Sequence, residues 1–281
     1  MDTFRWQGVE LAYSEDGEGP PILFLHNGGT SSTIWRHQLE ALRAEHRCIA
    51  VDLPGFGCTP RPGDPLDHAG LVAITAALLE HLDVHDAVVV GNCMGANLAV
   101  HLATSRPDLV DALVIVNPLT EATFDAGWLG LTHRSEHLAA GPTRFVREIA
   151  RRIIPPKLGA EATVRLQLGP KGIARGLHHD PELVALNRRA EQMPALIDVL
   201  DDMGAYGELD RLDGLDVPTT MIWGAANRVL SPKVGAALAE RLGVDRSVVL
   251  DGCGHLAMLE EPDAVTALVV ERCDRRTGTL R

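Results

Sequence analysis

Six short apolar segments recur along most of this chain, and their alternation with helical patterns is what most limits the possible folds. The apolar residues in each segment form a continuous run and do not alternate with polar ones, which is typical of parallel strands covered on both faces. Helical spacing appears between two of them, at Leu71, Ile74, Leu78 and Leu82. The alternation predicts a mostly parallel, doubly wound α/β sheet. The predicted strands are residues 20–26, 47–53, 86–92, 111–117, 217–223 and 246–252.

The alternation is interrupted in the middle of the chain. That region shows no strong strand pattern, but residues 143–154 and 181–203 have helical patterns, with prolines and glycines between them. We therefore expect a helical cap inserted between two strands of the core. A second domain with its own function is the alternative, although no independent core pattern supports it. The expected division is a core of residues 1–118 and 208–281 and a cap of residues 119–207.

Composition excludes several classes of partner. The 281 residues are 46% hydrophobic and carry a formal net charge of −12, which disfavours binding to nucleic acid or to anionic membranes. The N-terminal residues lack the basic and apolar regions of a signal peptide, and no apolar run approaches the roughly 20 residues of a membrane span. We expect a cytoplasmic protein that acts on a small molecule. Its oligomeric state is left open.

The cysteines are scattered and odd in number, which predicts free thiols. No Cys-x-x-Cys pair suggests structural zinc, and no even set of closely spaced cysteines suggests a disulfide framework. One of them is therefore available as a nucleophile, and no metal or organic cofactor is expected. The five are Cys48, Cys58, Cys93, Cys253 and Cys273.

Residues 87–100, AVVVGNCMGANLAV, place a cysteine in a strand–turn–helix context. The stretch Gly91-Asn92-Cys93-Met94-Gly95 fits the nucleophile elbow G-x-S-x-G, with cysteine in the serine position. Such a turn lifts the central side chain above the sheet edge, near a helix N-terminus that lowers the pKa of a thiol. The alternative is an inert buried cysteine, which is common among small apolar side chains.

Four further segments accompany this elbow, in the order FLHNGGTSSTIW, VDLPGFGCT, WGAANRVLSP and DGCGHLAMLEEPDAV. They are similar to the His-Gly loop, the D-x-P-G-x-G loop, the acid-bearing loop and the G-H segment of α/β hydrolases. With its elbow, the chain therefore resembles a cap-bearing protein of the α/β-hydrolase fold. The matching segments lie in the expected core; the expected cap is generic. The resemblance implies the α/β-hydrolase fold, a mostly parallel doubly wound sheet with an inserted helical cap.

The resemblance implies a catalytic triad with two departures from the usual residues. Cys93 takes the place of the nucleophile, and His255 is the general base that takes the thiol proton and returns it to the leaving group. The acid position holds Asn227, and an alternative acid position before the cap holds Asn117. An asparagine oxygen can accept the imidazole Nδ1–H, and a thiol needs less activation than a hydroxyl. Cys-His-Asn is an established variant of the triad.

Other residues compete for parts of this site. Glu121 and Asp125 follow the strand before the cap and could orient His255, although solvated or helix-capping carboxylates are the simpler interpretation. Cys253 lies two residues before His255 and is a filler, a resolving thiol or a substrate contact. Filler is the simplest of these.

The resemblance also implies an oxyanion hole made by the backbone N–H groups of Met94 and Gly28. Asn27 replaces a glycine of the family pattern, and we expect it to tolerate a left-handed backbone. Asn27, Trp128 and Glu121 are the candidate substrate contacts, with the aromatic side chain equally able to belong to the core of the cap.

A cysteine nucleophile implies a thioester intermediate. The substrate is then an ester, lactone or thioester, either free or linked to coenzyme A or a carrier protein. Hydrolysis is the leading hypothesis. Transfer or cyclisation, in which an acceptor other than water takes the acyl group, is the second. A ligand-binding protein without catalysis is the third, because the acidic triad member is missing.

Overall fold

The computed structural model describes residues 1–128, 130, 149, 152 and 156–276. Its centre is an eight-stranded sheet made of β1 (Asp2–Trp6), β2 (Val9–Asp16), β3 (Pro21–Leu25), β4 (Arg47–Asp52), β5 (Ala87–Asn92), β6 (Val110–Val116), β7 (Thr219–Gly224) and β8 (Arg246–Leu250). The strand order is β1-β2-β4-β3-β5-β6-β7-β8. β2 is antiparallel to both neighbours, and the strands from β4 to β8 are parallel. The prediction of a mostly parallel α/β sheet is confirmed.

The six predicted strands correspond to β3 through β8, and the sequence analysis missed the hairpin of β1 and β2. Gln7 and Gly8 join these two strands, and both have positive φ, of 46° and 85°. Two such residues form the tight turn whose twist suits a hairpin. The hairpin extends the sheet beyond β4, and no candidate site residue lies on it.

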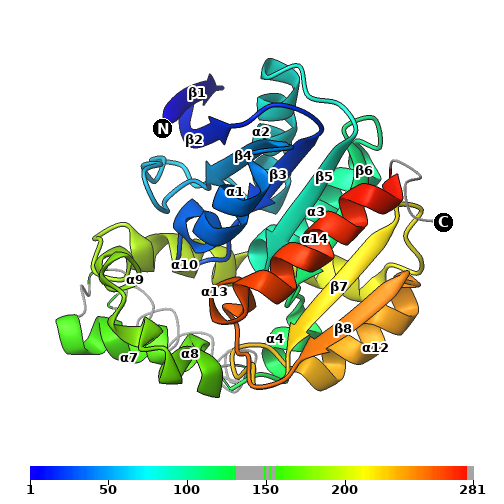
Figure 1. The fold of residues 1–281 in the computed structure, drawn as a ribbon. Coiled ribbons are helices and arrows are strands. Elements are labelled where there is room, and N and C mark those ends of the chain that lie inside the picture. Colours follow the sequence, from blue (N-terminus) through cyan, green and yellow to red (C-terminus); the bar gives the residue numbers. More distant parts are fainter. Residues whose placement is uncertain (129, 131–148, 150–151, 153–155, 277–281) are drawn as a thin grey trace.

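Helices cover both faces of the sheet (Figure 1). One face is covered by α1 (Arg36–Leu42), which follows the short η1 (Ser32–Trp35), and by the long α14 (Pro262–Arg276). The opposite face is covered by α2 (His68–His81), α3 (Met94–Ser105) and α12 (Pro232–Leu242). No helix of the described part of the chain has the length and apolarity that crossing a bilayer requires.

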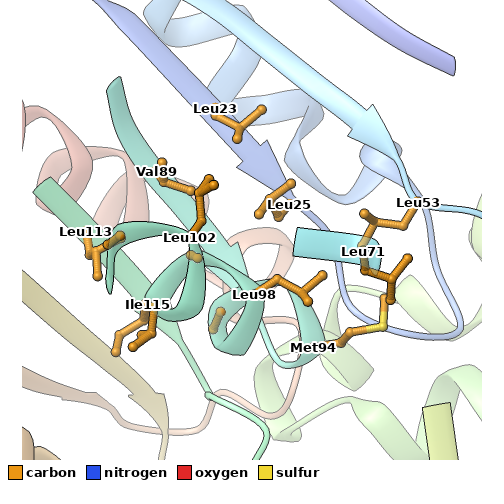
Figure 2. Close-up of a cluster of buried hydrophobic side chains, with 14 of the residues drawn as sticks. Leu23, Leu25, Leu53, Leu71, Val89, Met94, Leu98, Leu102, Leu113 and Ile115 are labelled. Carbon is orange, nitrogen blue, oxygen red and sulfur yellow. The ribbon is translucent and has the colours of Figure 1, made fainter. Parts of the chain in front are cut away.

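Successive residues of the central strands enter different cores, which explains why these strands are apolar throughout. Val89 of β5 belongs to one buried cluster, while its neighbours Val88 and Val90 belong to the other. Figure 2 shows the first cluster, in which Leu98 and Leu102 of α3 lie over the sheet. The helix that begins at the elbow is therefore fixed to the sheet by its own buried face.

The described residues between β6 and β7 are helical, as the expected cap requires. They form α4 (Glu121–Asp125), α7 (Lys157–Gln167), α8 (Pro170–Ala174), η2 (Leu177–His179), α9 (Pro181–Leu186), α10 (Gln192–Asp201), α11 (Met203–Tyr206) and η3 (Gly207–Arg211). The predicted helical stretch 181–203 is three helices instead of one. Almost all of the stretch 143–154 lies outside the described residues, and the exact limits 119–207 stay a prediction.

Polar contacts fasten α10 to the loop that follows β4. The Arg61 guanidinium donates two hydrogen bonds to Asp198, at 2.6 and 3.1 Å. The backbone N–H of Arg61 donates to Glu191, and that of His68 donates to Asp202 at 2.6 Å. A bidentate arginine–carboxylate pair fixes orientation as well as distance. This part of the cap is therefore held rigidly against the core.

Candidate active site

The carboxyl ends of the parallel strands meet at one edge of the sheet, and the loops there assemble the candidate site. Ligands of open α/β sheets bind in this position. The loops after β3, β5, β6, β7 and β8 contribute Gly28, Cys93, Asn117, Asn227 and His255 in turn. Hydrogen bonds connect several of these loops directly, as described below. The residues predicted from five distant segments are therefore brought to a single place.

Cys93 occupies the tip of a strained turn between β5 and α3. Its φ of 55° and ψ of −111° are unfavourable for any residue with a Cβ. A Cβ added to Gly91 would overlap the Gly95 carbonyl, and one added to Gly95 would overlap the backbone of Leu25. Glycine is therefore required at both positions for the helix to start so close to the strand. This is the backbone geometry of a nucleophile elbow.

The backbone N–H groups of Met94 and Gly28 are the predicted donors of the oxyanion hole. The N–H of Met94 faces the Cys93 sulfur and favours its thiolate. Within the described part of the chain, the N–H of Gly28 donates to no protein acceptor. In this loop the positive φ, of 87°, belongs to Gly29 and not to Asn27, contrary to our expectation. Glycine is thus still used where the loop needs a left-handed backbone, two residues later than predicted.

Asn27 uses its whole side-chain amide within the protein, which corrects its assignment as a substrate contact. Its Nδ2 donates to the Gly28 carbonyl at 2.9 Å and to Gln167 Oε1 at 3.2 Å. Its Oδ1 accepts from the Thr30 hydroxyl at 2.7 Å and from Asn92 Nδ2 at 3.2 Å. An amide group has two donors and two acceptor sites. None is left for a ligand, so Asn27 braces the loop.

Burial keeps both the thiol and the imidazole of the site neutral. It raises the pKa of Cys93 to about 12, with only partial opposition from the Met94 N–H. It lowers the pKa of His255 to about 3. Burial therefore outweighs the helix N-terminus that we expected to lower the thiol pKa. Among the described contacts no hydrogen bond joins the sulfur to the ring, and the resting pair is a thiol and a neutral imidazole.

Asn227 contacts the His255 ring as predicted, but through the opposite end of its amide. Its Nδ2 lies 3.2 Å from Nδ1 of His255. Its Oδ1 accepts backbone N–H bonds from Val229 at 3.0 Å and from Leu230 at 3.1 Å. Those two donors fix which atom is oxygen, because an NH₂ group placed there would face two N–H groups. The expectation that the oxygen accepts from Nδ1–H is therefore wrong.

This orientation sets the tautomer of His255. A neutral imidazole has one N–H and one acceptor nitrogen, and the partner of one nitrogen decides the state of the other. Because Asn227 donates to Nδ1, the ring proton resides on Nε2. At rest the ring thus presents a hydrogen-bond donor at Nε2, where a general base would need a lone pair.

Asn117, the alternative acid position, holds the backbone of His255 and not its ring. Its Nδ2 donates to the His255 carbonyl at 3.2 Å, and its Oδ1 accepts from the Gly224 N–H at 3.0 Å. Asn92 donates to the same carbonyl at 3.3 Å. Two asparagines at the ends of neighbouring strands therefore fix the histidine loop. Asn92 had no predicted role of its own.

Three further residues were candidates for this site, namely Glu121, Asp125 and Trp128. Burial is the cause of the lowered pKa of His255. The Glu121 carboxylate packs against Gly207 of η3. Trp128 is 67% exposed and lines a surface hollow of about 540 Å³ together with Asn227 and Arg228. The assignment of Glu121 and Trp128 as substrate contacts stays a prediction.

Cys253 is buried on the face of the sheet opposite Cys93. It belongs to the cluster under α1 and α14, whereas Cys93 belongs to the cluster under α2 and α3. Both cysteines are free, and burial raises the pKa of Cys253 to about 12 as well. This environment agrees with the interpretation of Cys253 as a filler.

Glu260 is a structural part of the site that the sequence analysis passed over. Its carboxylate is 1% exposed and accepts N–H bonds from Gly254 at 2.8 Å, Gly169 at 2.9 Å and Gly172 at 3.1 Å. The first donor precedes His255, and the other two open α8 of the cap. Glu260 therefore fastens the cap to the histidine loop. The sequence feature that could have identified Glu260 is its position five residues after His255.

Comparison with known proteins agrees with this architecture. The family model described as alpha/beta hydrolase fold matches residues 20–262. A pimeloyl-acyl-carrier-protein methyl ester esterase of Vibrio vulnificus is 25% identical, over 91% of this chain and 95% of its own length. Haloalkane dehalogenase 2 of Mycobacterium bovis is 25% identical, over 93% of this chain and 91% of its own.

Solved structures give the same result for the fold. A thermophilic esterase from Thermogutta terrifontis superposes with a TM-score of 0.81 at 24% identity, covering 98% of this chain and 97% of that one. The chain belongs to the α/β-hydrolase fold family, as the match to the family model shows.

Proposed function

We propose that this member of the α/β-hydrolase fold family cleaves an ester, lactone or thioester through a thioester formed on Cys93. The observation that carries the proposal is the elbow itself. Cys93 is held in a strained conformation at the carboxyl edge of the sheet, and the N–H of Met94 faces its sulfur. That arrangement matches what acyl transfer needs, a nucleophile next to donors for the oxyanion. The relative that is a methyl ester esterase supports the ester-cleaving part of the proposal.

The proposed reaction needs only side chains, backbone N–H groups and water. The Cys93 sulfur attacks the acyl carbon, and the carbonyl oxygen becomes an oxyanion held by the two N–H groups. The thiol proton passes to Nε2 of His255, on a ring that then carries its other proton on Nδ1. The bond to the leaving group breaks as the ring returns the proton to that group. Water cleaves the thioester in the same way, releasing a carboxylic acid and restoring the thiol.

The resting tautomer of His255 opposes the first proton transfer. The ring becomes a base at Nε2 only when its proton moves to Nδ1, and the Asn227 amide must then turn its oxygen toward the ring. That rotation gives up the hydrogen bonds from Val229 and Leu230, each contributing about 1 kcal/mol. We therefore expect slow turnover, with thioesters and activated esters preferred over alkyl esters.

The same tautomer favours acyl transfer as a second function. Water needs a general base to attack a thioester, whereas amines and thiols are better nucleophiles and depend on one less. A ring that presents Nε2–H at rest assists water poorly. An acyl group on Cys93 would then wait for such an acceptor.

Turnover by Cys93 variants tests both functions. The wild type, Cys93→Ala and Cys93→Ser are assayed on p-nitrophenyl esters, a lactone and acyl-coenzyme A thioesters, with and without an added amine or thiol. We expect activity in the wild type and none above background in Cys93→Ala. Full activity of Cys93→Ala would contradict the mechanism. Partition of products toward the added acceptor identifies a transferase, and ligand binding without turnover identifies a binding protein.

A further inference from the structure

Gln192 is a buried amide that has no hydrogen-bond partner within the described structure. It begins α10 and is 3% exposed, and both its Oε1 and its Nε2 lack partners. Leaving a buried polar group unpaired is costly, because the group gives up its hydrogen bonds to water and gains none. A methionine of similar size would fill the same space without that cost. The position is therefore unfavourable for folding alone, and a bound molecule would explain it.

The Gln192 amide lies on the loop that carries the proposed oxyanion hole. A Cβ placed on Gly29 would lie 3.7 Å from Gln192 Nε2, and one placed on Gly28 would lie 3.3 Å from Leu196. Gln192 and Leu196 are one helical turn apart, so this face of α10 covers the loop. The pair of Arg61 and Asp198 anchors the same helix. The amide is thus held over the loop that carries Gly28 and Gly29.

Tyr206 supplies a second unpaired polar group near the elbow. Its hydroxyl has no hydrogen-bond partner among the described residues, and the side chain is 1% exposed. With Met94 it lines a cavity of about 30 Å³, and its ring packs edge-on against His68 at 4.8 Å. A thiolate on Cys93 would raise the pKa of this hydroxyl further, which places the two groups within electrostatic range.

We propose that Gln192, together with the Tyr206 hydroxyl, recognises a neutral amide or hydroxyl group on the substrate, an inference that rests on the proposed acyl chemistry at Cys93. A glutamine amide needs a partner that both donates and accepts. A carboxylate only accepts and an ammonium only donates. The nearby guanidinium of Arg61 is already paired with Asp198, so it offers no free charge to a carboxylate. Acyl chains with an amide or hydroxyl close to the scissile carbonyl fit best.

Two p-nitrophenyl esters of equal chain length test this recognition. N-acetylglycine p-nitrophenyl ester carries an amide that p-nitrophenyl pentanoate lacks. The wild type should favour the amide ester in kcat/KM, after correction for the faster spontaneous hydrolysis of that ester. Gln192→Met should lower this preference about tenfold, the effect of one hydrogen bond of roughly 1.4 kcal/mol. Gln7→Met makes the same change in the exposed turn after β1 and should keep the wild-type ratio.

A binding experiment separates this inference from the proposed function. Cys93→Ala is titrated with N-acetylglycine methyl ester and with methyl pentanoate, with and without Gln192→Met, and the thermal shift is followed. A preference for the amide ligand that Gln192→Met removes supports recognition even if the wild type cleaves neither ester. The inference is overturned if Gln192→Met keeps the wild-type ratio, or if it lowers Tm and affects both esters equally. If Gln192→Met fails to fold, Gln192→Glu replaces it, and it should also lose the preference.

Discussion

The side-chain nitrogen of Asn227, and not its oxygen, lies 3.2 Å from Nδ1 of His255. The oxygen of the same amide is held by the backbone N–H groups of Val229 and Leu230. A carboxylate at this position would accept those bonds equally well and would have a second oxygen for Nδ1–H. The replacement of one atom thus reverses the direction of the hydrogen bond to the ring.

Asn227→Asp should increase activity. The substitution keeps both backbone hydrogen bonds, moves the ring proton to Nδ1 and gives Nε2 a lone pair for the Cys93 proton. The reverse change in a serine triad costs roughly four orders of magnitude. We expect kcat/KM on activated esters to rise at least about tenfold, part of that range. Steady-state assays measure it, and ¹⁵N shifts of the ring report the accompanying change of tautomer.

Asn117→Asp is the matched control for that variant. Asn117 donates to the His255 carbonyl, and a carboxylate there would face that carbonyl oxygen instead. The variant should lose stability and gain no activity. Equal gains from the two substitutions would show that added negative charge, and not the tautomer, controls the rate.

Alkylation of Cys93 should be slow at neutral pH and should keep rising with pH. Iodoacetamide reacts with the thiolate, and burial raises the pKa of Cys93 to about 12. The rate should increase about tenfold per pH unit from pH 7 to 10. Cys58, which is exposed, is the internal control. Peptide mass spectrometry follows both sites, and a Cys93 rate above that of Cys58 at pH 7 would indicate a preformed ion pair.

The buried ring of His255 should make folding stability depend on acid pH. Its pKa is about 3 in the folded protein and about 6.5 in the unfolded chain. The unfolded state therefore binds the extra proton first, so the stability present above pH 6.5 is lost as pH falls toward 3. The loss is at most about 1.4 kcal/mol per pH unit for this group.

Urea unfolding of the wild type and of His255→Gln at pH 7.5 and 5.0 measures the contribution of His255 to the pH dependence of stability. The variant should lose less stability between the two pH values than the wild type does. His26 and His68, which burial also shifts downward in pKa, are present in both proteins and cancel in the comparison. Parallel losses would show that His255 is accessible to protons in the folded state.

Glu260→Gln should loosen the contact between cap and core. An amide in place of the carboxylate turns an NH₂ group toward at least one of the N–H donors, Gly254, Gly169 or Gly172. An unsatisfied buried donor costs about 1–3 kcal/mol. The free energy of unfolding in urea should fall by that amount, and unchanged stability would mean that the three contacts contribute little.

The fold was predictable because its strongest signals are local. Apolar β-branched runs identified β3 through β8, and Gly91 and Gly95 marked the elbow because backbone crowding excludes any Cβ there. The hairpin of β1 and β2 was not predicted because its residues are partly exposed and partly charged. The strand pattern of a half-exposed edge is weaker than that of a buried centre.

The sequence predicts the residues of the candidate site but not the contacts that those residues make. The sequence motifs point to Cys93, Asn227 and His255. The direction of the Asn227 amide, however, depends on where two backbone N–H groups lie in the folded loop. The neutral state of the thiol depends likewise on burial. Gln192 lies in a region of the chain without a matching motif, so its place over Gly29 could come only from the tertiary structure.

Intact mass spectrometry of the protein during turnover tests the central claim most directly. The wild type is mixed with excess p-nitrophenyl ester or acyl thioester and quenched in acid, and Cys93→Ala is treated in parallel. We expect the wild type to gain the mass of one acyl group, on the peptide that contains Cys93, and the variant to gain none. Turnover by the wild type without that adduct, or an adduct on another residue, would contradict the account.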